Sequence, residues 1–280
     1  MPFLWYNSGM LDNQPAVRET SPIRLKLRKG IFILPSFITT LSFFSGFYAL
    51  ISSFNGNYYN AAVAIILAGL FDFLDGKVAR LTNTTSHFGM EYDSLSDLMS
   101  FGIAPGFLVY SWALQPFGRV GWMAAFLYVI CGALRLARFN TLAQTGKATE
   151  RFMGLPIPAA AMVVASMVIM TKDLLLLEKL NPFVLVGTVY VLAFLMVSNI
   201  NYISFKKFDF ARRRPFGILV FMVLSIYILA VMPELMIPIV AIGYAVSGPA
   251  EWVWGLLHGK KAGKETAETT EPSEALKPQK

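Results

Sequence analysis

Long apolar runs alternate with short polar segments along most of the chain. A helix that spans a bilayer needs about 20 mostly apolar residues, and eight runs approach that length. Several contain Pro or Gly, which neighbouring helices make tolerable within a membrane. The pattern predicts an all-α integral membrane protein with about eight transmembrane helices. Their approximate ranges are 31–54, 58–74, 95–114, 120–142, 155–170, 182–200, 216–232 and 235–256.

The positions of Lys and Arg predict how these helices are oriented. Cytoplasmic loops of membrane proteins carry an excess of basic residues. If the N-terminus is cytoplasmic and eight spans alternate, all but three of the 24 Lys and Arg residues fall on the cytoplasmic side. The three exceptions are Arg119, Lys172 and Lys179. We therefore expect both termini to be cytoplasmic.

The composition supports a membrane protein with polar ends. Of the 280 residues, 55% are apolar and only 15% are charged, which excludes an ordinary soluble domain. We expect a basic cytoplasmic arm at 1–30, a transmembrane domain at 31–257 and a disordered cytoplasmic tail at 258–280. The net charge of +7 lies mainly in predicted loops, which favours an anionic membrane surface over nucleic acid. One cysteine and two histidines exclude a disulfide framework and a His-rich zinc site.

A dense group of carboxylates lies where the second apolar run ends and the third begins. Residues three and four apart share one face of a helix. The first such stripe contains Asp72, Asp75, Gly76 and Ala79. The second contains Gly89, Asp93 and Asp97. The two helices are predicted to be antiparallel neighbours, so the four carboxylates should converge. Buried acids repel one another unless a cation compensates them, and oxygen ligands favour one or two Mg²⁺ or Mn²⁺ ions.

Small residues and an arginine beside these acids predict a phosphate-containing ligand. Gly76, Ala79 and Gly89 leave room against the backbone, and Arg80 offers a fixed positive charge for phosphate. A metal that bridges a diphosphate neutralises its charge and orients it for attack. The cluster therefore indicates phosphoryl-type chemistry at a membrane interface. The competing interpretation, loop acids paired with Lys77 and Arg80, is disfavoured because charges within spans are costly.

Residues 72–97 resemble the signature of the CDP-alcohol phosphotransferase family, D-x2-D-G-x2-A-R-x8-G-x3-D-x3-D, at every specified position. The resemblance implies a membrane enzyme that cleaves a CDP-linked donor, releases CMP and passes the phosphate-bearing half to an alcohol. It implies a divalent metal held by Asp72, Asp75, Asp93 and Asp97, with Asp97 also acting as general base. The implied contacts to the CDP group are Thr39, Asp72, Gly76, Ala79, Arg80 and Gly89. One departure lies in the first run, where Ser36 replaces the Asn of the family's frequent Pro-Asn-x-x-Thr.

Three further segments resemble one branch of that family, the CDP-diacylglycerol-dependent phosphatidylserine synthases. They are residues 97–105, 135–140 and 152–160. The resemblance implies CDP-diacylglycerol and L-serine as substrates and a homodimer in the lipid bilayer of the inner (cell) membrane. It implies an active site that faces the cytoplasm and no nucleic-acid partner.

The carboxylate of serine would need a cation near the proposed base. Arg135 and Arg138 share a helix face near the cytoplasmic end of the fourth run, where a guanidinium could reach it. Asn140 could add a hydrogen bond. The competing interpretation is that both arginines only anchor the topology.

Two alternative functions remain open from the residues alone. The same chemistry could serve another acceptor, glycerol 3-phosphate or an inositol phosphate, although a phosphorylated acceptor would favour a denser basic pocket. A cation transporter would also carry intramembrane acids, but near the bilayer midplane rather than at one cytoplasmic edge.

Overall fold

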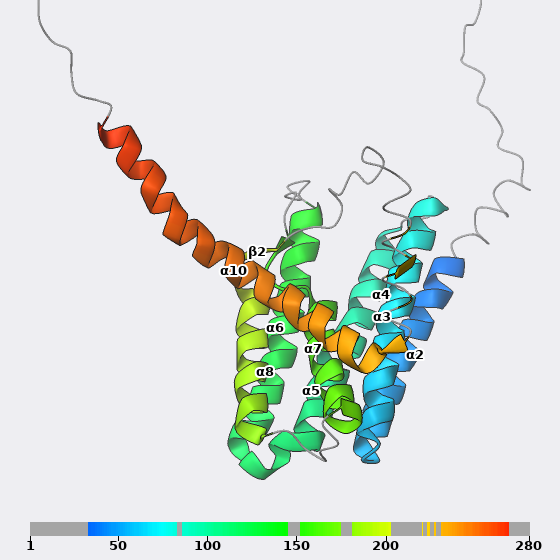
Figure 1. Cartoon of the computed structure of the whole chain (residues 1–280). Coiled ribbons are helices and arrows are strands. Elements are labelled where there is room, and N and C mark those ends of the chain that lie inside the picture. Colours follow the sequence, from blue (N-terminus) through cyan, green and yellow to red (C-terminus); the bar gives the residue numbers. More distant parts are fainter. Residues whose placement is uncertain are drawn as a thin grey trace, which may run out of the picture.

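A computed structural model describes residues 33–82, 86–144, 152–174, 181–202 and 231–268, together with residues 220, 223, 224 and 227. This part of the chain is helical apart from one pair of two-residue strands (Figure 1). Among the described residues, three helices are long and apolar enough to cross a membrane, at Leu34–Phe54, Arg119–Leu142 and Pro233–Trp254. The all-helical prediction is thus confirmed apart from the strand pair, and three candidate spans are identified.

Helices α2 (Ile33–Phe54) and α3 (Tyr58–Leu81) form an antiparallel hairpin at the N-terminal side of the fold. Small residues allow their backbones to approach closely. In α3 these include Ala61, Ala64 and Ala68, all buried. The Ser42 hydroxyl of α2 donates to the Ala68 carbonyl at 3.0 Å. Helix α3 continues past the predicted end of its span, so the first acidic stripe lies on one unbroken helix.

The third apolar run is a longer and less regular helix than the sequence predicts. It begins with α4 (His87–Asp97) and continues through the π-helical η1 (Leu98–Ile103), α5 (Ala104–Val109), the π-helical η2 (Tyr110–Leu114) and a 3-10 turn, η3 (Gln115–Phe117). Segments of π-helix are rare and occur frequently at functional sites. Here η1 directly follows Asp97.

Two serine hydroxyls connect this irregular helix to α2. Ser96 donates to the Thr39 carbonyl at 3.2 Å, and Ser100 donates to the Ser42 carbonyl at 2.9 Å. Gly46 lies so close to Ser100 that a Cβ atom there would approach the Ser100 Cα to 2.6 Å. The acidic end of α4 is therefore fixed against α2.

The remaining elements complete a bundle. They are α6 (Arg119–Gln144), β1 (Phe152–Met153), α7 (Ile157–Ile169), the π-helical η4 (Met170–Leu174), α8 (Pro182–Val197), β2 (Asn201–Tyr202) and α10 (Pro233–Glu268). Strands β1 and β2 pair antiparallel, with Phe152 opposite Tyr202. The core contains Phe101, Leu108 and Ile157, together with Tyr128, whose hydroxyl donates to the Phe101 carbonyl at 3.1 Å.

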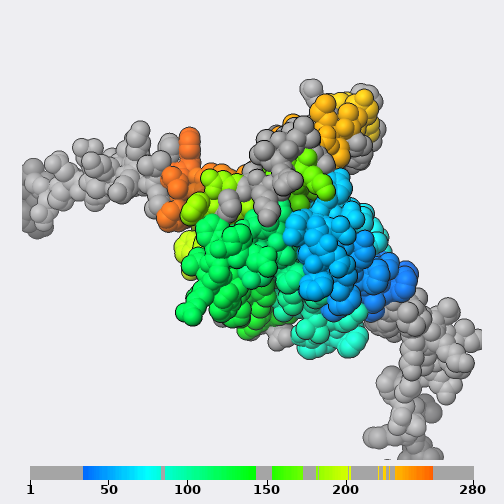
Figure 2. Space-filling model, turned by 90° about the horizontal axis from the view of Figure 1, so that it is seen from below, coloured from blue at the N-terminus to red at the C-terminus, as the bar shows by residue number. Residues whose placement is uncertain are grey.

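Helix α10 crosses the bundle obliquely, and its C-terminal end projects away from it (Figure 1). It contacts α7, η4 and β2. Seen from below, the blue residues of α2 pack directly beside the green middle part of the chain (Figure 2). Through its contacts with α7, η4 and β2, helix α10 packs on elements that precede it in the bundle.

Most of the predicted spans coincide with helices, but the count of eight remains a prediction. The predicted span at 216–232 lies mostly outside the described residues, and the basic arm at 1–30 lies wholly outside them. Helix α10 ends at Glu268 and therefore includes the first residues of the tail expected to be disordered at 258–280. The rest of that tail, 269–280, lies outside the described residues.

Candidate metal and nucleotide site

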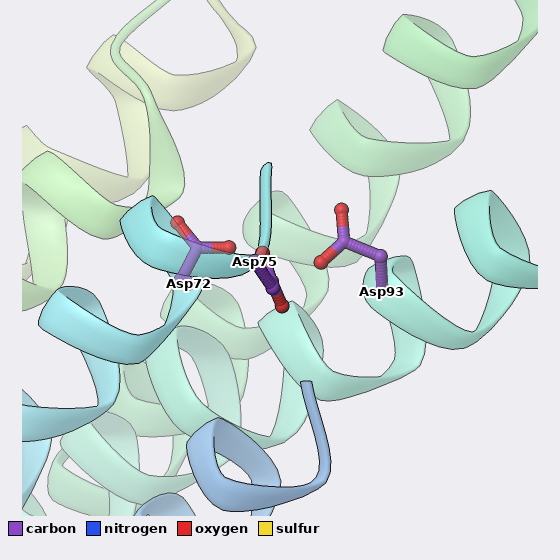
Figure 3. A group of neighbouring side chains, drawn as sticks. All are labelled: Asp72, Asp75 and Asp93. Atoms are coloured by element: carbon purple, nitrogen blue, oxygen red, sulfur yellow. The ribbon is translucent and has the colours of Figure 1, made fainter. Parts of the chain in front are cut away.

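Three aspartates meet where α3 and α4 face each other. Asp72 and Asp75 are three residues apart on α3, and Asp93 comes from α4. Each offers one carboxylate oxygen, and these three oxygens lie within 4.8 Å of one another. Figure 3 shows Asp93 pointing across from its helix toward the pair on α3. The two predicted acidic stripes are thus brought together.

Asp97, the fourth predicted ligand, lies one helical turn beyond Asp93 and outside this group of three. Its carboxyl group is hydrogen-bonded to that of Asp72. Two carboxyl groups that hydrogen-bond to each other share a proton, because only a protonated oxygen can donate. Asp97 is therefore linked to the cluster through Asp72 and is placed to accept or release a proton beside it.

The charges of the cluster are poorly compensated by the protein. Burial and, after it, the charges of Asp75 and Asp72 raise the pKa of Asp93 to about 7. Burial also raises the pKa of Asp75 to about 6; the charge of Asp72 adds to the shift, and a hydrogen bond from Thr39 opposes it. Asp75 Oδ2 and Asp93 Oδ1 are buried and have no hydrogen-bond partner within the described part of the chain. Converging carboxylate oxygens with unused lone pairs are the donor set that a hard divalent cation needs, so the residues fit such an ion.

A cavity of about 190 Å³ opens beside the three aspartates. Five of the residues predicted to contact the CDP group line it: Thr39, Gly76, Ala79, Arg80 and Gly89. Asp75 and Asp93 line it as well, so the cavity is continuous with the acidic cluster. Four lining residues were not assigned from the sequence: Pro35, Ser36, Ser86 and Met90. Ser36 is the residue that departs from the family's frequent pattern, and it lies at the site itself.

Local hydrogen bonds shape this cavity. The Arg80 Nε donates to the Gly76 carbonyl one turn earlier on α3 at 2.8 Å, and the exposed Arg80 side chain lines the cavity. Ser86 caps the start of α4, because its hydroxyl accepts from the Gly89 backbone N–H at 3.0 Å. A serine just before a helix is a recognised N-cap signal, so the sequence could have assigned Ser86 to this edge of the pocket.

The three predicted acceptor residues have different surroundings. Arg135 is buried on α6, where the charge of Asp97 acts on it, and its Nε has no hydrogen-bond partner among the residues that the structure describes. Arg138 is exposed and donates through Nη2 to Asn199 Oδ1 at 2.9 Å. The two arginines thus have different neighbours, Asp97 for Arg135 and Asn199, just after the end of α8, for Arg138, and their role in binding the acceptor stays a prediction.

Asn140 connects the acceptor side to the acidic helix. Its Nδ2 donates to the Ser94 hydroxyl at 2.8 Å, and Ser94 follows Asp93 on α4. No local pattern marks Asn199 as a neighbour of Arg138, since the two residues lie far apart along the chain.

Comparison with known proteins agrees with this geometry. The CDP-alcohol phosphatidyltransferase family matches residues 32–198, more than half of the chain. A "CDP-diacylglycerol--serine O-phosphatidyltransferase" of Helicobacter pylori (strain J99) is 40% identical over 177 residues, which cover 63% of this chain and 74% of the relative. The Bacillus subtilis protein of the same name is 38% identical over 174 residues, covering 62% and 92%. An "Archaetidylserine synthase" of Methanothermobacter thermautotrophicus is 44% identical over 135 residues, covering 48% and 56%. The chain therefore belongs to the CDP-alcohol phosphatidyltransferase family, and it is a helical membrane protein.

Proposed function

We propose that the protein transfers the phosphatidyl group of CDP-diacylglycerol to the hydroxyl of L-serine, giving phosphatidylserine and CMP. The observation that carries the proposal is the group of three aspartate oxygens within 4.8 Å of one another, beside a pocket that Arg80 and three small residues line. The names of the Helicobacter and Bacillus relatives support serine as the acceptor, at 40% and 38% identity.

The CDP head of the donor occupies the cavity between α2, α3 and α4. Gly76, Ala79 and Gly89 admit the nucleotide against the backbone, and Arg80 holds a phosphate oxygen. Asp72, Asp75 and Asp93 would hold Mg²⁺ or Mn²⁺, with Asp97 joined to them through Asp72. When bound, a divalent ion supplies charge neutralisation at the diphosphate and stabilises the leaving CMP.

Asp97 acts as the general base. The serine oxygen forms a bond to the lipid-side phosphorus, the bond from that phosphorus to CMP breaks, and the hydroxyl proton passes to Asp97. A carboxylate is a far weaker base than an alkoxide, so the proton moves as the new bond forms and not before it. The proximity of Arg135 to Asp97 supports this arrangement, since a serine carboxylate on the guanidinium would bring the hydroxyl toward the base.

The orientation in the membrane follows from the charge pattern. We propose eight spans, both termini in the cytoplasm, and an active site that faces the cytoplasm from the inner membrane. The near-complete restriction of Lys and Arg to one side supports this topology. A homodimer is part of the proposal, and an exposed apolar face on α2, where Phe44 is 63% exposed, offers area for lipid or for a second subunit.

The test is an acceptor screen with the purified full-length protein in lipid nanodiscs. CDP-diacylglycerol and Mg²⁺ or Mn²⁺ are supplied with one alcohol at a time, and CMP release and the lipid product are measured. CMP and phosphatidylserine with L-serine support the proposal. CMP release with glycerol 3-phosphate or an inositol phosphate, but not with serine, would replace the acceptor. A protein that binds Mn²⁺ yet releases no CMP with any alcohol would overturn the transferase assignment, and metal transport in vesicles would then support the transporter alternative.

A further inference from the structure

One wall of the CDP cavity is formed by the N-terminal half of α4, which has little buried surface of its own. This half contributes Gly89, Met90 and Asp93 to the cavity. All 11 residues of α4 are described, and only Ser96, near its C-terminal end, is buried. Segments with few buried contacts open at a low cost in free energy. Hydrogen bonds to neighbouring helices therefore have a large share in holding this wall in place.

Helix α4 packs mainly against α2, although Asp93 points toward the aspartates of α3 (Figure 3). At the buried end of this contact and its continuation into η1, the Ser96 and Ser100 hydroxyls donate to carbonyls of α2. At the exposed end, the hydroxyls of Tyr92 on α4 and Thr40 on α2 are 2.9 Å apart. The position of Asp93 and of the cavity wall relative to α3 is therefore set through α2.

The direction of the hydrogen bond between Tyr92 and Thr40 follows from the other partner of Thr40. A threonine hydroxyl has one proton, and that of Thr40 is donated to the Ser36 carbonyl at 2.7 Å. The Tyr92 hydroxyl therefore donates to Thr40 Oγ1. The resulting chain of hydrogen bonds runs from Tyr92 through Thr40 to Ser36, which itself lines the cavity. It connects the α4 wall of the cavity to the α2 wall.

The Tyr92 ring is supported on its own helix. Phe88, one turn earlier on α4, stacks against it, with centroids 6.0 Å apart and planes at 9°. We propose that Tyr92 is a positioning residue that, through Thr40, holds the N-terminal half of α4 over the cavity and so sets the affinity for the cytidine diphosphate group of the donor. This inference rests on the proposed function, but only on its donor site, and it does not depend on which alcohol is the acceptor.

A purely structural role for Tyr92 makes a different prediction from a positioning role. If the residue only stabilises the fold, Tyr92→Phe should lower the melting temperature and leave the Kd for CMP unchanged. If it positions α4, Tyr92→Phe should weaken the binding of CMP and of the donor together. The KM for L-serine should then stay near that of the wild type, because the predicted acceptor residues Arg135 and Arg138 lie on α6.

The experiment measures the Kd for CMP by calorimetry at saturating Mn²⁺, with the full-length protein in lipid nanodiscs, and the KM for CDP-diacylglycerol and for L-serine. Loss of one hydrogen bond between neutral groups predicts a roughly fivefold rise in the Kd for CMP and in the KM for the donor in Tyr92→Phe. The matched control is Tyr58→Phe, which removes a tyrosine hydrogen bond of the same length, 2.9 Å, to the Ser111 carbonyl. Tyr58 begins α3, about 27 Å along the helix from Gly76, so this variant should keep the wild-type Kd for CMP.

Two changes at Thr40 test whether Tyr92 acts through it. Thr40→Val removes the accepting oxygen and should weaken CMP binding at least as much as Tyr92→Phe, whereas Thr40→Ser keeps the hydroxyl and should keep the wild-type Kd. The double variant Tyr92→Phe/Thr40→Val should bind CMP no more weakly than Thr40→Val alone. Additive effects in the double variant would overturn the inference and leave the proposed function intact, as would an unchanged Kd in Tyr92→Phe when the wild type binds CMP. A wild type that binds no CMP would overturn the proposed function, and the inference with it.

Discussion

The affinity of the acidic cluster for a divalent metal should depend steeply on pH, because two of its carboxylates have raised pKa values. Asp93 has a pKa of about 7 and Asp75 of about 6. A carboxylate must lose its proton to ligate a metal. Metal binding is therefore strongest above pH 7 and weakens as the pH falls through 7 and then through 6.

The expected size of the effect follows from these two values. Between pH 8 and pH 6 the ionised fraction of a group with a pKa near 7 falls about tenfold, and that of a group with a pKa near 6 about twofold. If both must be ionised, the Kd for Mn²⁺ should rise roughly 20-fold over this interval. Carboxylates with ordinary pKa values near 4 would give almost no change.

The assay is a titration of the purified protein with Mn²⁺ at several pH values, followed by electron paramagnetic resonance of the free ion. Calorimetry in two buffers of different ionisation enthalpy measures the protons released on binding, and release near pH 7 should be substantial. Asp93→Asn is the matched variant. It should bind Mn²⁺ more weakly at every pH, and its Kd should rise only about twofold between pH 8 and pH 6, because the roughly tenfold contribution of Asp93 is lost. A Kd that does not change between pH 8 and pH 6 would refute the reasoning, because it would mean that the carboxylates are ionised throughout.

The other predictions concern the base, the packing beside it and the outer arginine. Asp97→Asn should lower kcat by roughly 10²–10⁴-fold in a CMP-release assay while Mn²⁺ still binds, and a variant with normal kcat would remove Asp97 as the base. Gly46→Ala forces a Cβ to within 2.6 Å of the Ser100 Cα and should cost about 1–3 kcal/mol, seen as a lower melting temperature. Gly187→Ala, with no atom within 4 Å of its added Cβ, is the neutral control. Arg138→Ala should raise the KM for L-serine more than it weakens the binding of CMP, and an equal loss of both would remove Arg138 from the predicted acceptor site.

The apolar pattern predicted the helices well because span length and hydrophobicity are local properties of the sequence. The pattern did not predict the π-helical η1 or the continuation of α3 to Leu81. These features depend on contacts between elements: η1 is fixed against α2 by the Ser100 hydroxyl and by the absence of a side chain at Gly46. A hydropathy pattern contains no information about such contacts.

The cluster of acids was predictable for a related reason. Spacings of three and four residues put Asp72 and Asp75 on one face, and a short link places Asp93 opposite them, so local periodicity and one turn suffice. Ser86 could have been found in the same way, from its place before a helix. The different surroundings of Arg135 and Arg138 could not, because the partner of Arg138, Asn199, lies 61 residues away along the chain, just after the end of α8.

The division between donor and acceptor sites has a consequence for how specificity could change within such a fold. The residues around the CDP group come from α2, α3 and α4, which lie inside the region that matches the family. Arg135, the buried arginine predicted to bind the acceptor, comes from α6, a different helix. A substitution on α6 can therefore alter the surroundings of the acceptor without touching the metal ligands or the nucleotide pocket. If Arg135 binds the carboxylate of serine as proposed, acceptor affinity and donor chemistry are governed by different helices, and each can vary while the other is kept.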